Sequence, residues 1–263
     1  MEYQFEIGNG EFGEIYHLAA AAVLLGQVNK QIAVRFRDFP AGEEFFRFLS
    51  IETSPWQSDM KRSHLPSTAD VIREHFRPGC LDGMVAAIRG LAQKDNWRFP
   101  FPELATGQQK AVIWQRNKNH QSYRNSHPSF VRQIVDLCLR EGVTPVLIGE
   151  RHHFQDVIEL GEFYNTEFFV QDNTIARQLW FFDMLFRLHR GFAHVGMMSG
   201  AMDGPAMFLG HKTIYLAKRC RETRIAKVSE AVKNLICQPI TYQDTFQELS
   251  SDELAGLKQK LFA

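Results

Sequence analysis

The chain has 263 residues, of which 44% are hydrophobic and 23% are charged, the balance of an ordinary globular protein. This composition excludes a disordered chain, a collagen and a disulfide-rich miniprotein. The 30 Lys and Arg residues balance the 30 Asp and Glu residues, so no basic field exists to hold a nucleic-acid backbone, and we expect no nucleic-acid partner.

The cysteines and the N-terminal residues bear on the compartment. Cys80, Cys138, Cys220 and Cys237 lie far apart, without the paired spacing of a zinc site or the density of a secreted scaffold. Residues 1–14 contain acidic residues where a signal peptide needs a basic region, and no stretch reaches the ~18 apolar residues of a membrane span. We therefore expect a cytoplasmic protein in a reducing compartment, without a transmembrane segment.

The first predicted elements form a β-α-β pattern. They are a strand at 3–7, a glycine-rich turn at 8–13, a helix at 15–26 and a strand at 31–36. The weaker pattern that follows contains two expected helices, at 41–50 and 81–93. Pro100, Pro102 and Gly107 then give the next segment the composition of a linker. We therefore predict a small N-terminal α/β domain over 1–105.

A second α/β pattern begins after this linker. The expected strands are 110–114, 144–149, 167–171, 193–197, 213–217 and 236–241. The expected helices are 129–141, 174–189, a short one after 204, 222–234 and one from 251. Apolar strands that alternate with helices indicate a parallel sheet buried on both faces. The sequence predicts a C-terminal Rossmann-like domain over 106–263.

The first candidate motif is a glycine loop between a strand and a helix. Gly8, Gly10 and Gly13 satisfy G-x-G-x-x-G, a spacing that lets a backbone pass close to a phosphate. An NADP site is one interpretation, and a tight strand-to-helix turn is the other. Glu11 and Glu14 argue against a dinucleotide, because they would place two carboxylates beside a pyrophosphate.

The second motif lies between a predicted strand and a short helix. Ser199 and Gly200 can offer a hydroxyl and free backbone N–H groups to a diphosphate. The structural alternative is a capped helix start, with Ser199 as the N-cap and Asp203 complementing the helix dipole.

The third motif is a basic loop after the strand at 110–114. Arg116, Lys118 and Arg124 stand where open α/β sheets bind ligands, and such cations suit phosphate. A solvated loop is the alternative. Gly149 and Glu150 follow the next strand. No spacing of His, Cys, Asp or Glu predicts a metal site.

These residues resemble the heptosyltransferase-like family of GT-B glycosyltransferases, and bacterial fucosyltransferase-like GT-B enzymes are a close neighbour. Residues 13–21 are similar to the family's G-D-hydrophobic-x-H-x-x-P-A element, with Glu14 in the place of the acid. Residues 198–203 are similar to its D-[ST]-G-x-x-H donor loop, with Asp203 in the place of the histidine. The fold that this implies has two Rossmann-like domains facing a cleft, the N-terminal one reduced.

The resemblance implies a metal-independent transferase that moves a sugar from a nucleoside diphosphate to an acceptor, with no cofactor. Glu14 is then the expected catalytic base, with Glu11 and His17 as alternatives. The residues expected at the donor diphosphate are Arg116, Lys118, Arg124, Ser199, Gly200, Ala201, Met202 and Asp203. Gly149 and Glu150 are expected near the nucleotide. The acceptor stays open, and so do two other functions: an NADP-dependent oxidoreductase that uses the glycine loop, and a noncatalytic nucleotide-sugar-binding module.

Overall fold

The structure is a computed structural model that contains two parallel sheets. It describes residues 3–7, 12–28, 32–36, 40–55, 67–105, 107–117, 125–150, 154, 156–197, 199–217, 224–241 and 248–263.

The N-terminal sheet has three parallel strands in chain order, β1 (Tyr3–Ile7), β2 (Ile32–Phe36) and β3 (Glu52–Pro55). The helix α1 (Phe12–Gln27) connects β1 to β2, so the predicted β-α-β unit is confirmed. The helix α2 (Pro40–Phe48) follows β2, also as predicted. The short strand β3 has no counterpart among the predictions, because the sequence ETSP lacks an apolar alternation.

The helix α1 is apolar on all sides. Its side chains from Ile15 to Leu25 are buried with the exception of the half-buried Val23. A helix without a polar face has to be covered all round. In this fold α1 packs on β1 and β2 and also against helices of both halves of the chain.

Two helices and a 3₁₀ turn connect the sheets. The helix α3 (Thr68–His75) was not predicted; it begins at the N-cap Ser67, whose side chain accepts a hydrogen bond from the Asp70 backbone N–H. The helix α4 (Asp82–Lys94) confirms the predicted helix at 81–93. The expected linker contains the turn η1 (Pro102–Leu104), and Leu104 is fully buried. This segment is therefore packed onto the fold by its apolar side chains.

The C-terminal sheet has six parallel strands in the order β6-β5-β4-β7-β8-β9. They are β4 (Lys110–Gln115), β5 (Thr144–Gly149), β6 (Ile158–Gly161), β7 (Gly191–Met197), β8 (Lys212–Ala217) and β9 (Leu235–Pro239). Counted from β4 this is the 3-2-1-4-5-6 order of a Rossmann sheet. The prediction of an α/β chain with parallel sheets is confirmed.

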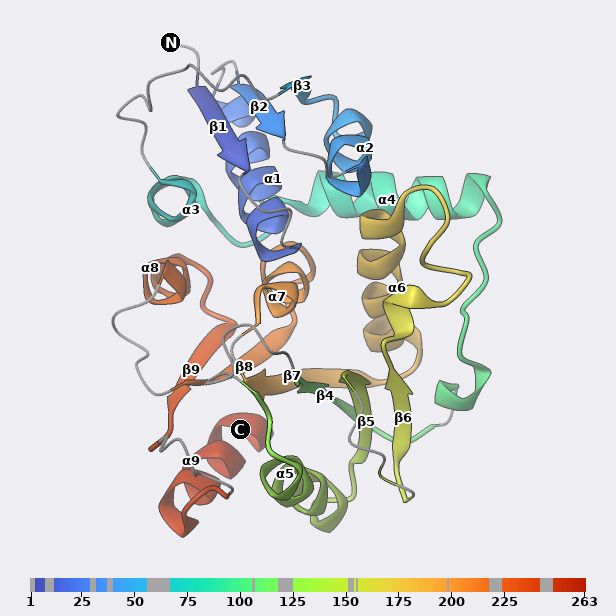
Figure 1. Ribbon diagram of the computed structural model, residues 1–263, viewed down its shortest axis with the longest axis vertical. Coiled ribbons are helices and arrows are strands. Elements are labelled where there is room, and N and C mark those ends of the chain that lie inside the picture. Colours follow the sequence, from blue (N-terminus) through green and yellow to red (C-terminus); the bar gives the residue numbers. More distant parts are fainter. Residues whose placement is uncertain are drawn as a thin grey trace.

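Helices cover both faces of this sheet (Figure 1). On one face lie α5 (Pro128–Arg140) and α9 (Ser251–Phe262). On the other face α6 (Thr174–Leu188) and α7 (Asp203–Leu209) lie between the two sheets, and α8 (Arg224–Ala231) packs against β9 and α3. Burial on both faces explains why the strands read as continuous apolar runs.

The predicted strand at 167–171 is wrong. These residues form turns that follow the 3₁₀ helix η3 (Phe163–Asn165), and the edge strand is β6. Phe168 and Phe169 make edge contacts with each other, and Phe169 packs in the same way on Phe181 of α6. The apolar residues of this run therefore pack in an aromatic cluster. The periodicity of a sequence does not distinguish such a packed turn from a buried strand.

One apolar cluster joins the N-terminal and C-terminal halves of the chain. It contains residues of α1, α2 and α4 together with residues of α6, α7 and the strands β4, β5 and β8 of the C-terminal sheet. The domain boundary between residues 105 and 106 stays a prediction.

Candidate functional site

The order of the C-terminal sheet reverses between β4 and β7. From β4 the chain builds outward to β5 and β6, and from β7 it builds outward to β8 and β9. In open α/β sheets ligands bind at the carboxyl ends of the strands at such a switch point. Arg116 directly follows β4, and Ser199 comes two residues after the end of β7, so both lie where a ligand site is expected.

The basic loop is closed at its base. The Arg116 backbone N–H donates to Ser126 Oγ at 3.2 Å, and the Ser126 backbone N–H donates to the Arg116 carbonyl at 2.7 Å. This pair of hydrogen bonds holds both ends of the loop at the carboxyl end of β4. The predicted phosphate contacts Lys118 and Arg124 lie outside the described residues.

The end of β5 approaches β4 closely at Gly149. Its φ is +102°, and a Cβ on this residue would lie 2.1 Å from the Gln115 carbonyl oxygen. Only glycine is accommodated here. The next residue, Glu150, accepts a hydrogen bond from the Asn117 backbone N–H at 3.3 Å, so its carboxylate lies beside the end of β4.

The Ser199 turn differs from a capped helix start. Ser199 precedes the 3₁₀ helix η4 (Gly200–Met202), and its side chain makes no capping hydrogen bond. The N-cap residue of α7 is Met202. Ser199 therefore does not cap a helix with its side chain, and a hydrogen bond of 3.0 Å from the Met202 N–H to the Ser199 carbonyl oxygen closes the turn. The other part of the capped-helix interpretation agrees with the structure, since Asp203 lies in the first turn of α7. Ser199 and Gly200 are half-buried, and Ala201 follows in the same turn.

Asp203 lies in a buried polar cluster. The residue is only 1% exposed. Its carboxylate accepts a hydrogen bond from Tyr215 Oη and lies 2.6 Å from His17 Nε2. This contact joins α7 to both α1 and β8. Asp203 therefore does not reach solvent in this structure.

The neighbouring Tyr16 belongs to the same cluster. Burial raises the pKa of the Tyr16 phenol, and the negative charge of Asp203 raises it further, so the neutral phenol is favoured. A Cβ on Gly204 would lie 2.7 Å from the Tyr16 ring. The missing side chain of Gly204 is therefore what lets α1 approach α7 so closely.

The three candidate bases differ in exposure. Glu14 lies in the first turn of α1 and is half-buried. His17 is fully buried, and its Nδ1 atom has no hydrogen-bond partner among the described residues. Glu11 lies outside the described residues, as do Gly8 and Gly10 of the glycine loop, whereas Gly13 is in the first turn of α1.

Sequence reasoning missed the polar partners that come from other elements. Tyr215 sits in the apolar strand TIYLA, where a tyrosine reads as a core residue. His194 and His211, both buried, were not singled out as a pair either. A buried polar residue in an otherwise apolar run is the signal that could have drawn attention to Tyr215.

Three observations concern metals, membranes and thiols. Among the described residues no cluster of His, Cys, Asp or Glu could hold a metal ion. Within the same part of the chain, no helix has the length and apolarity needed to cross a bilayer. Cys237 is disulfide-bonded, whereas Cys80 and Cys138 are free. The cytoplasmic, reducing compartment expected from the sequence stays a prediction.

Neither a protein-family model nor a curated protein matches the chain. It is similar to the E. coli ADP-heptose LPS heptosyltransferase II, at 11% identity over 98% of this chain and 97% of that chain, with a TM-score of 0.47. It is also similar to the iron-containing heptosyltransferase TibC, at 8% identity over 81% and 57%, with a TM-score of 0.42. A third similar structure is Anabaena HepE in complex with UDP and glucose, at 11% identity over 99% and 91%, with a TM-score of 0.39. Such identities and scores are too low to transfer a function to this chain.

Proposed function

We propose that this chain is a GT-B-like glycosyltransferase that moves a sugar from a nucleoside diphosphate to a hydroxyl or other nucleophile of an acceptor. The observation that carries the proposal is the buried contact between His17 and Asp203. It brings together the two segments that resemble the heptosyltransferase-like family, although 186 positions separate these residues in the chain.

The same contact orients the proposed site. Helix α1, whose first turn carries Glu14, packs directly against η4, the 3₁₀ helix that follows Ser199. One motif supplies a carboxylate and the other supplies a hydroxyl with backbone N–H groups. Proton removal at the acceptor and stabilisation of the leaving diphosphate need these two kinds of group.

The reaction assigns one role to each group. Glu14 takes the proton of the acceptor hydroxyl while the acceptor oxygen forms a bond to the anomeric carbon of the sugar. The bond from that carbon to the diphosphate breaks, and the electron pair leaves with the diphosphate. Arg116 and the Ser199 turn stabilise the charge on the leaving group, together with Lys118 and Arg124 of the basic loop.

Exposure decides among the candidate bases. An acceptor hydroxyl has to reach the base, and Glu14 is half-buried whereas His17 is enclosed. We assign proton transfer to Glu14. His17 and Asp203 instead hold α1 against α7, so that the position of Glu14 relative to the donor loop is kept.

The first test is a thermal-shift screen with ADP, UDP, GDP, CMP, TDP and NADP(H), with and without Mg²⁺. A ligand that binds only the folded state raises the melting temperature. The proposal predicts stabilisation by a nucleoside diphosphate, with an effect that EDTA does not remove. Stabilisation by NADP(H) alone would contradict it and point to an oxidoreductase that uses the glycine loop.

The second test is Glu14→Gln, assayed by release of nucleoside diphosphate from the nucleotide sugar selected by that screen. The expected result is a rate roughly 10²- to 10⁴-fold lower with donor binding unchanged, because only the proton acceptor is lost. Glu103→Gln is the matched control, since Glu103 is exposed on η1. Unchanged turnover in Glu14→Gln would remove the assigned base, and binding without turnover in the wild type would indicate a noncatalytic module.

A further inference from the structure

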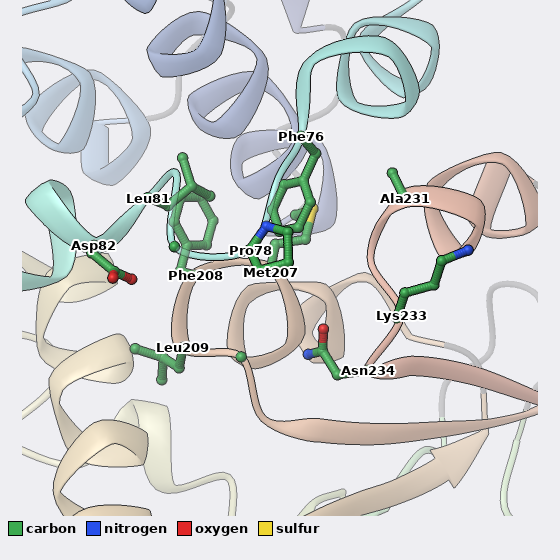
Figure 2. A pocket seen from close by; sticks show the side chains of 12 residues that line it. Phe76, Pro78, Leu81, Asp82, Met207, Phe208, Leu209, Ala231, Lys233 and Asn234 are labelled. Carbon is green, nitrogen blue, oxygen red and sulfur yellow. The ribbon is translucent and has the colours of Figure 1, made fainter.

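A pocket of about 250 Å³ lies at the edge of the C-terminal sheet opposite to the proposed donor site (Figure 2). Its walls come from the connection between α3 and α4, from the C-terminal end of α7 and from the turn between α8 and β9. Gly210 lies two residues before β8, and Asn234 directly precedes β9, so both are at the amino ends of these strands. The pocket is therefore separate from the proposed donor site, which lies at the carboxyl ends of the strands.

Most of the pocket wall is apolar. Phe76, Leu81 and Met207 are each at least nine-tenths buried, and their side chains line the space. Figure 2 shows the Phe76 ring beside Met207, with Pro78 in front of both. This wall suits an aromatic or branched aliphatic body, which it would remove from water.

Asn234 supplies an oriented acceptor. Its Nδ2 donates to the Ala206 carbonyl at 2.6 Å and to the His211 carbonyl at 2.8 Å. Both amide hydrogens are thus used, and Oδ1 is available only as an acceptor. In Figure 2 this oxygen points toward Pro78 and Met207.

Asp82 supplies a negative charge at another side of the pocket. It is exposed in the first turn of α4, and its carboxylate has no hydrogen bond or ion pair with a described residue. In Figure 2, Lys233 lies across the pocket from Asp82, and its ammonium group points away from the pocket. The cation in electrostatic reach of Asp82 is Arg89, whose guanidinium is already paired with Asp183. The polar groups that face the pocket are therefore acceptors, one of them charged.

We propose that this pocket binds an aromatic primary amine that carries a second hydrogen-bond donor at its far end. The ammonium group lies at the Asp82 carboxylate, the ring lies on the wall of Phe76 and Met207, and the far donor lies at Asn234 Oδ1. The negative charge of Asp82 selects a cationic ligand over a neutral or anionic one.

Calorimetric titration of the full chain with tyramine tests the proposal. Tyramine is expected to bind more tightly than phenethylamine, which lacks the hydroxyl, and more tightly than 3-(4-hydroxyphenyl)propionate, which reverses the charge. Asp82→Asn is expected to weaken tyramine binding roughly five- to tenfold, the effect of one partly exposed charge-assisted hydrogen bond. Its effect on the uncharged 4-ethylphenol is expected to be smaller.

Asp95→Asn is the matched control, because Asp95 is an exposed aspartate at the opposite end of α4. It should leave tyramine binding unchanged. Both variants lie at exposed positions, and their melting temperatures verify that they are folded. The proposal is overturned if the propionate binds as tightly as tyramine, if Asp82→Asn has no effect, or if no binding occurs up to about 10 mM.

Discussion

The Asp203 carboxylate is held by side chains from two other elements, His17 of α1 and Tyr215 of β8. A charge in an apolar interior is tolerated only when its oxygens are paired in this way. The sequence analysis predicted a diphosphate contact for Asp203, and that role stays a prediction. Its observed surroundings favour a positioning role for this residue.

Asp203→Ala is expected to lower the free energy of unfolding by about 3–5 kcal/mol, because it leaves His17 and Tyr215 without their buried partner. Urea unfolding measures this difference. Asp172→Ala is the control, since Asp172 is exposed, and a loss within about 0.5 kcal/mol is expected. Equal stability of the two variants would show that the buried cluster contributes little.

At the scale of elements, two neighbouring histidines link β7 to the start of β8. Trp114 Nε1 donates to His194 Nδ1 at 3.2 Å, and His194 Nε2 lies 3.3 Å from His211 Nδ1. Since the indole only donates, the network assigns the proton of His194 to Nε2, which donates to His211. Phe186 of α6 stacks on His211 with the ring centres 3.7 Å apart. This chain of bonds requires both histidines to be neutral.

Burial lowers the pKa of His211 to about 3, against a smaller opposing effect of Asp183, and lowers the pKa of His194 well below its usual value. Between about pH 3 and 6.5 the unfolded chain therefore binds more protons than the folded chain, and stability falls as the pH falls. At pH 5 the expected loss from His211 is about 2 kcal/mol relative to pH 7.5.

Urea unfolding at pH 7.5 and pH 5 checks this prediction. His211→Gln should reduce the pH dependence, whereas His75→Gln on α3, where the His75 side chain is 21% exposed, should keep it. An identical pH dependence in wild type and His211→Gln would contradict the assignment.

At the scale of the whole molecule, the two halves of the chain share one apolar cluster. Helix α1 of the N-terminal half and α6 of the C-terminal half both contribute to it, and α1 also contacts α7 directly. The helices α6 and α7, which lie between the sheets in Figure 1, both contribute apolar side chains to this cluster. Separating the halves would expose this surface to water, at a cost that grows with its area.

We therefore expect the chain to unfold in one cooperative transition. Differential scanning calorimetry should give equal calorimetric and van't Hoff enthalpies, the mark of a two-state process. Two resolved transitions would contradict this prediction and support independent domains with a boundary near residue 105.

Local signals in the sequence predicted most of the elements. The apolar runs of β4, β5 and β7 and the apolar helix α1 are visible without any neighbour, because burial on all sides removes the polar positions. The same rule failed at residues 167–171, where an apolar run packs as a turn on α6. The parallel direction of the strands followed from the β-α-β rhythm, whereas their order in the sheet comes from the structure.

The sequence by itself determined the class of fold and the segments that carry the proposed site, since both depend on residues close together in the chain. It singled out Glu14, Ser199 and Arg116 because each adjoins a predicted helix or strand end. Only the tertiary structure decided that His17 meets Asp203, that Tyr215 completes their cluster and that Asn234 turns its oxygen toward a pocket. Those contacts depend on how helices pack across the two sheets, and side-chain periodicity along one element carries no information about its partner.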